Sequence, residues 1–72
     1  MDLVKLEDKQ TLSREEAAAH LRHIADELAS GNDFRMERDS LRFVAKVPPT
    51  VRLKIEFEVE EDGAEFEIEL TW

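Results

Sequence analysis

Hydrophobic and charged residues alternate along positions 51–72 almost without interruption. Side chains of a strand point in turn to two opposite faces, so this alternation predicts two amphipathic strands joined as a hairpin. Asp62-Gly63 is a favoured type I′ pair, and centring the turn on it sets the expected register. On the apolar face this register pairs Val59 with Phe66, Phe57 with Ile68, Ile55 with Leu70, and Leu53 with Trp72.

The other face of the expected hairpin is acidic. The same register places Glu60 opposite Glu65, Glu58 opposite Glu67, and Glu56 opposite Glu69. Like charges directly opposite each other destabilise an antiparallel pair. A binding role for these carboxylates would account for them, and so would solubility or adaptation to a salty cytoplasm, where ions screen the repulsion.

A helix is predicted to begin at Arg14 and to end at Ser30-Gly31-Asn32. Ser13 and Glu16 have capping-box spacing, in which the hydroxyl accepts from the Glu16 amide and the carboxylate reaches back to the Ser13 amide. Gly31 suits the left-handed position that follows a helix. The apolar positions of one helix face are Ala17, Leu21, Ile24 and Leu28.

A second hairpin is predicted between the helix and the acidic strands. Its strands are 34–38 and 41–47, with Met36 facing Phe43, Phe34 facing Ala45, and Glu37 facing Arg42. Pro48-Pro49 ends the second strand, and a tight connection would lay the next strand beside it. That pairing brings Arg42 near Glu56 and Lys46 near Arg52. A shorter strand is expected at Leu3–Glu7, before the helix.

These elements predict an α+β fold in a single domain spanning residues 1–72. The expected order is β-α-β-β-β-β, with two layers: one amphipathic helix packed on a mostly antiparallel sheet of four to five strands. One helix is narrow for a sheet of that width. A second copy of the chain, forming a homo-oligomer, or another protein would then cover the remaining apolar surface.

The chain resembles the amphi-Trp domain, a small domain of archaeal, especially haloarchaeal, and some bacterial proteins. The residues that carry the resemblance are Ser13–Ala18, Leu21–Gly31 and the alternating carboxylate strand that ends at Leu70-Thr71-Trp72. The resemblance implies this fold and a prokaryotic cytoplasm. It implies no activity, substrate, cofactor or catalytic residue.

The composition narrows the class of partner. The net charge is −8, from 18 acidic and 10 basic residues, which opposes binding to nucleic acid or to an anionic membrane. The sequence has no cysteine and no apolar stretch long enough for a membrane span, and its first residues lack a signal-peptide core. We therefore expect a cytoplasmic protein.

Candidate chemistry is limited, and no enzyme is expected. The serines fall at a cap, a helix end and a turn, and no nucleophile lies beside a base. His20 and His23 lie one turn apart near Glu16 and Glu27, which could hold Zn²⁺, but solvated histidines that contact glutamate are the favoured alternative because a third ligand is missing.

Two interpretations of the acidic strands remain open. The first is recognition of a protein partner through complementary charge, and the second is binding of Mg²⁺ or Ca²⁺. Trp72 is either a lid on the sheet core or an anchor in an interface. The candidate partner-binding residues are Glu56, Glu58, Glu60, Glu65, Glu67, Glu69 and Trp72.

Overall fold

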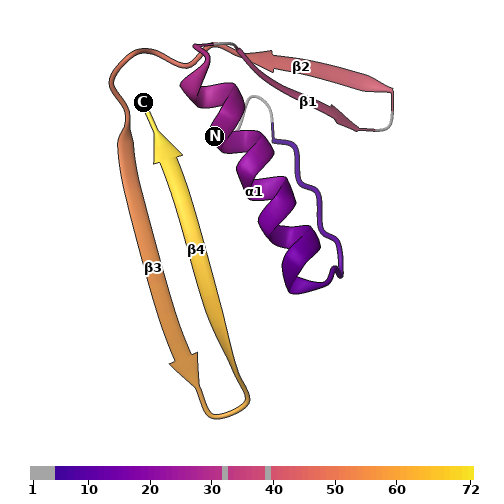
Figure 1. Cartoon of the computed structure of the whole chain (residues 1–72), viewed down its shortest axis with the longest axis vertical. Helices are drawn as coiled ribbons and strands as arrows, with labels where there is room; N and C mark the ends of the chain where they lie inside the picture. Colours follow the sequence, from indigo (N-terminus) through magenta and orange to yellow (C-terminus); the bar gives the residue numbers. More distant parts are fainter. Residues whose placement is uncertain (1–4, 32, 39) are drawn as a thin grey trace.

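The computed structural model describes residues 5–31, 33–38 and 40–72. Within these ranges it has one helix and four strands, which confirms the α+β class (Figure 1). Of the expected strand at Leu3–Glu7, the first two residues lie outside the described part, and residues 5–7 belong to no strand. The elements are α1 (Arg14–Ala29), β1 (Phe34–Arg38), β2 (Leu41–Ala45), β3 (Arg52–Glu60) and β4 (Gly63–Thr71).

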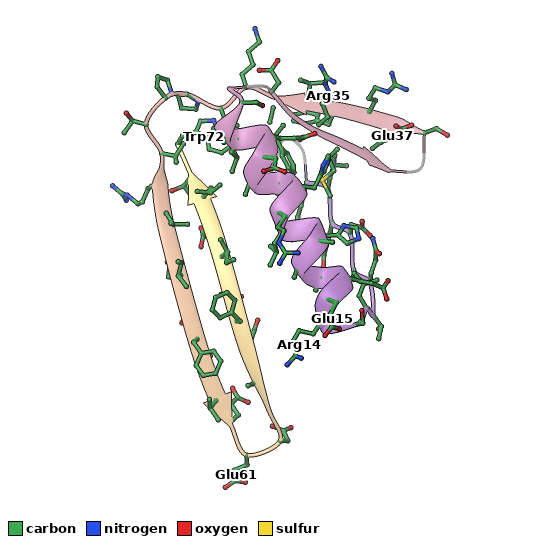
Figure 2. The ribbon with its side chains drawn as sticks, viewed as in Figure 1. Arg14, Glu15, Arg35, Glu37, Glu61 and Trp72 are labelled. Carbon is green, nitrogen blue, oxygen red and sulfur yellow. The ribbon has the colours of Figure 1, made fainter. Side chains whose placement is uncertain are left out.

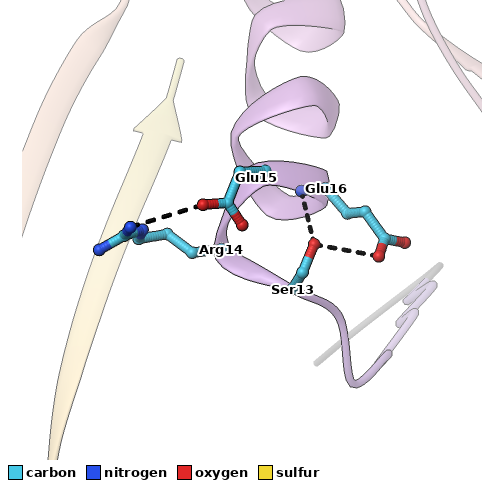
Figure 3. Close-up of polar contacts among 4 residues, drawn as sticks. All are labelled: Ser13, Arg14, Glu15 and Glu16. Atoms are coloured by element: carbon cyan, nitrogen blue, oxygen red, sulfur yellow. Dashed lines mark hydrogen bonds and ion pairs between the residues drawn. The ribbon is translucent and has the colours of Figure 1, made fainter.

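Helix α1 begins and ends where the sequence predicts. The Glu16 amide donates to Ser13 Oγ at 3.1 Å, as expected for an N-cap (Figure 3). The Glu16 carboxylate accepts a hydrogen bond from the same hydroxyl, at 3.0 Å, and this contact takes the place of the expected one with the Ser13 amide. At the other end Gly31 has φ +76° and Ser30 Oγ donates to the Glu27 carbonyl at 2.8 Å. Both ends of α1 are therefore capped.

The β1–β2 hairpin has the predicted register. Met36 pairs with Phe43, Phe34 with Ala45, and Glu37 with Arg42. On the outer face Arg42 Nε lies 3.9 Å from Glu37 Oε2. The turn contains Asp39, which lies outside the described residues, and Ser40, whose φ of 67° falls in the left-handed region.

The β3–β4 hairpin corrects the predicted register by two residues. The two-residue turn is Glu61-Asp62, so Glu60 pairs with Gly63 and Val59 with Ala64. No residue of this turn has a positive φ, although the predicted type I′ turn requires two. A shift of two residues keeps every side chain on its predicted face, because the strand period is two. The apolar pairs become Phe57 with Phe66, Ile55 with Ile68, and Leu53 with Leu70.

The strands form two separate two-stranded sheets, β1–β2 and β3–β4, where the sequence predicted a single sheet. The segment 46–51 that joins them contains Pro48-Pro49. Proline fixes φ near −65° and favours an extended residue before it, so the segment runs on and β3 leads away from β2 (Figure 1). No contact joins β2 to β3, so the predicted proximity of Arg42 to Glu56 is absent. The proximity of Lys46 to Arg52, which involves the joining segment, stays a prediction.

The two hairpins differ in their contact with α1. The helix contacts β1, and it makes no contact with β3 or β4, all of whose residues are described. The radius of gyration is 14.1 Å, against about 11 Å for a compact chain of this length. No side chain within the described ranges is fully buried. The two-layer packing is thus present only between α1 and the first hairpin.

Candidate functional site

The β3–β4 hairpin presents an uncovered apolar face. We define the apolar face as the residues of β3 and β4 that share one side of the hairpin: Leu53, Ile55, Phe57, Val59, Ala64, Phe66, Ile68 and Leu70. Exposure of its large side chains reaches 66% at Phe57 and 68% at Val59, and Leu70 alone is half-buried. Side chains stand out from both strands with no other element over them (Figure 2). Contiguous apolar surfaces this exposed are uncommon on monomeric soluble proteins.

An aromatic pair lies near the turn end of the apolar face. The rings of Phe57 and Phe66 face each other across the strands, with centroids 6.4 Å apart and an interplanar angle of 60°. This tilted arrangement is favoured for aromatic pairs, because the positive ring edge meets the negative ring face. The pair forms the bulkiest part of the apolar face.

The acidic face on the other side of the hairpin differs from the expected one in its pairs. Three pairs of opposed glutamates were predicted, and the structure has two. These are Glu56 with Glu67 and Glu58 with Glu65, each a different pairing from the predicted one. The register shift gives Glu69 a favourable partner in Lys54. Lys54 Nζ also lies 3.4 Å from Glu56 Oε2. The unfavourable charge is therefore concentrated toward the turn.

A hollow at the turn gathers several of these carboxylates. It has a volume of about 270 Å³ and is lined by Glu58, Glu60, Asp62, Gly63, Ala64 and Glu65. Within the described ranges, however, no three His, Cys, Asp or Glu side chains are close enough together to hold a metal ion. The register places these carboxylates around the hollow, but their oxygens do not converge on one point. The hollow can therefore attract cations through its summed negative charge.

Trp72 lies at the opposite, open end of the hairpin (Figure 2). It is 62% exposed, and with Thr50, Val51 and Arg52 it lines a shallow hollow. The predicted pairing of Trp72 with Leu53 is wrong, since Leu53 pairs with Leu70. Trp72 therefore closes no core in the described structure and extends the apolar surface beyond β4.

His20 and His23 both lie on α1. His23 Nε2 is 3.3 Å from Glu27 Oε1, one helical turn later, which confirms the expected contact between histidine and glutamate. Both histidines line the groove between α1 and β1 described next, together with Glu27 and Glu37. Among the described residues, no further His, Cys, Asp or Glu side chain joins them in a group that could hold a metal ion.

The groove between α1 and β1 was not predicted as a feature of its own. It has a volume of about 600 Å³, and apolar residues of the helix face meet those of β1 across it. Ile24, Phe34 and Met36 are half-buried there. The helical spacing predicted the packing face, and only the structure shows that the face is opposed by β1. The apolar lining residues are Leu12, Ala17, Leu21, Ile24, Phe34 and Met36.

No described helix has the length and the apolar character needed to cross a bilayer. The family model of the Amphi-Trp domain matches residues 1–72, which is the whole chain, and this match confirms the resemblance drawn from the sequence. Comparison with curated proteins and with solved structures found no match.

Proposed function

The chain belongs to the amphi-Trp domain family, and we propose that it is a small, non-enzymatic interaction module that binds protein through its β3–β4 hairpin. The cell compartment that we propose is the cytoplasm of an archaeon or a bacterium. Its net charge of −8 argues against nucleic acid as the partner. The proposal includes self-assembly as one form of protein binding.

The exposed apolar face carries this proposal. Burying its large side chains is favourable, by roughly 25 cal/mol per Å² of apolar surface removed from water. Interfaces draw much of their affinity from a few central aromatic anchors, and the tilted pair of Phe57 and Phe66 has that character. Trp72 adds a third aromatic side chain at the open end.

The acidic face adds selectivity to this binding. Carboxylates that lie opposite each other, as Glu58 and Glu65 do, maintain a negative potential over one side of the hairpin. Such a field speeds encounters with a basic surface and disfavours acidic partners. The hairpin thus combines an apolar side that provides affinity with a charged side that orients the approach.

The test is capture of partners by tagged protein from native lysate at high KCl, followed by mass spectrometry. Phe57→Asp disrupts the apolar face, and Glu58→Lys with Glu67→Lys disrupts the acidic face, each variant being checked for its helix by circular dichroism. We expect a bound protein, either another protein or untagged copies of this chain, that is lost with Phe57→Asp. Identical background profiles for the wild type and both variants would reject the proposal.

The single sheet predicted from the sequence is kept as a proposal for the bound protein. Strands β2 and β3 each have one unpaired edge, and joining them would give a four-stranded sheet with Arg42 near Glu56. Hydrogen exchange would test this pairing, because alternate amides of β2 and β3 would gain protection upon binding. Unchanged exchange at both edges would reject it.

The hollow at the turn supports a second candidate function, a response to divalent cations. Four carboxylates line it, and hard cations such as Mg²⁺ and Ca²⁺ prefer oxygen ligands. A defined site would give saturable shifts of a few amide resonances among residues 56–69 during titration with MgCl₂ or CaCl₂. Unsaturated shifts that KCl reproduces at equal ionic strength would reject the candidate.

A further inference from the structure

We propose that the apolar face of β3–β4 is the interface of a homodimer, in which the same face of a second copy covers it. This inference rests on the proposed interaction function and names the partner. The two hairpins would stack face to face as a small β-sandwich, with their sheets about 10 Å apart. Each copy would keep its own α1 on its own β1–β2 hairpin.

The amount of exposed surface fits a dimer. The chain exposes 6995 Å², whereas a compact monomer of 8.4 kDa exposes about 4,600 Å². The excess of roughly 2,400 Å² per chain is larger than the ~800 Å² that each partner buries in an interface of standard size, so the chain has enough uncovered surface for such an interface. A second copy of the chain can supply this cover without any further protein.

The rows of the apolar face are complementary to each other in reverse order. From the open end to the turn they are Leu53 with Leu70, then two Ile, then two Phe, then Val59 with Ala64. An antiparallel stack about a two-fold axis lays the large Leu row of one copy on the small Val59 and Ala64 row of the other. The same axis lays the two Ile on the two Phe. Large side chains thus meet smaller ones along the whole interface.

Charge favours this mode over the alternatives. Stacking through the apolar faces leaves both acidic faces on the outside, separated by two sheet layers and beyond a Debye length of about 8 Å. Stacking through the acidic faces, or joining β3 edges so that acidic faces become continuous, would bring Glu56 and Glu58 toward their copies. The opposition of like charges thus selects the apolar face.

The helix of the same chain is not the better cover. The apolar side of α1 already faces Phe34 and Met36 across the groove with β1. Moving α1 onto β3–β4 would expose those residues again, so the helix can cover only one of the two hairpins. A second copy covers the other hairpin without uncovering the first.

The experiment measures the mass and the contacts of the intact chain. Sedimentation equilibrium from micromolar to millimolar concentrations should give twice the 8.4 kDa chain mass for the wild type and for Arg35→Ala, a control on the exposed side of β1, and a single chain mass for Phe57→Asp. Isotope-filtered NMR on mixed labelled and unlabelled wild-type chains requires no variant. We expect contacts between Phe rings of one copy and Ile methyl groups of the other.

A single chain mass at every wild-type concentration would overturn the dimer. So would a dimer whose intermolecular contacts exclude the apolar face, whether or not Phe57→Asp folds. Failure of the dimer is separable from failure of the interaction function: a monomer that still captures a different protein through Phe57 keeps the function and removes the dimer. A monomer that captures nothing removes both.

Discussion

The hairpins β1–β2 and β3–β4 follow the same alternating pattern but differ in what covers their apolar faces. In the first, Phe34 and Met36 are half-buried against α1. In the second, Phe57 and Phe66 are 66% and 59% exposed and contact no other element. Alternation thus identifies the apolar face of each hairpin, and whether another element covers that face depends on the rest of the chain.

The outer faces of the two hairpins differ as well. Glu37 and Arg42 lie opposite each other on β1–β2 and form an ion pair, whereas Glu58 and Glu65 lie opposite each other on β3–β4. The first arrangement stabilises its hairpin and the second opposes it. Helix α1 thus packs on β1 of the first hairpin, whereas no described element packs on the second.

Loss of an aromatic anchor from β3–β4 should have the largest effect. Phe57→Ala should lower the free energy of unfolding by about 3 kcal/mol, since it removes a large side chain from the proposed interface. Urea unfolding at two protein concentrations measures this change. The wild-type midpoint should rise with concentration, and that of the variant should not. Glu58→Ala is the control, with a change within about 0.5 kcal/mol, and equal losses for both variants would contradict the uncovered-face interpretation.

Truncation on the first hairpin should act within one chain. Met36→Ala should cost about 2 kcal/mol, at the lower end for such changes because Met36 is only half-buried. The same urea experiment should show the loss at every protein concentration, with the dimer fraction of the folded protein unchanged. Arg35→Ala, on the exposed neighbour, is the control. Loss of the dimer in Met36→Ala would contradict the proposal that β3–β4, and not β1–β2, forms the interface.

Removal of the N-cap should have a smaller effect, passed through α1 to the first hairpin. Ser13→Ala loses the hydrogen bond from the Glu16 amide and should cost about 1 kcal/mol. Thermal unfolding followed by helical circular dichroism measures it, and Ser13→Asp should restore most of the loss. Amide exchange should quicken in α1 and β1 while β3 and β4 keep their rates. Equal quickening in all four elements would indicate a single cooperative unit.

Local signals predicted most of the elements, and they did so for physical reasons that lie within a few residues. Ser13 and Gly31 fix the ends of α1 because a hydroxyl acceptor and a left-handed residue satisfy the backbone there. The register of β1–β2 follows from its short turn and from the Glu37 and Arg42 pair. The match to the amphi-Trp family was also predicted, from residues 13–18 and 21–31 and from the alternating strand that ends at Leu70-Thr71-Trp72.

Long-range features were predicted less well. Asp62-Gly63 suggested one turn, whereas the chain turns at Glu61-Asp62. The pairing of β3 with β4 therefore shifts by two residues, and every side chain stays on its predicted face. Alternation cannot decide between such registers, because both place the same residues on the same face. The pairing of β2 with β3 depended on a reversal at Pro48-Pro49, where proline geometry favours an extended chain. The candidate residues Glu58 and Glu65 were on the predicted face, with partners that only the turn could set.

Charge reversal on the acidic face should have the smallest effect and the opposite sign. Glu58→Lys replaces the like-charge pair with Glu65 by an opposite-charge pair, which makes the outer face of β3–β4 resemble that of β1–β2. We expect the free energy of unfolding to rise by about 0.5 kcal/mol at low salt, and the gain to shrink as KCl shortens the Debye length. Urea unfolding across a KCl series measures it, with Glu58→Gln as a neutral control of intermediate effect. A loss of stability in both variants would mean that the carboxylate itself makes a stabilising contact, and the acidic face would then belong to the fold rather than to binding.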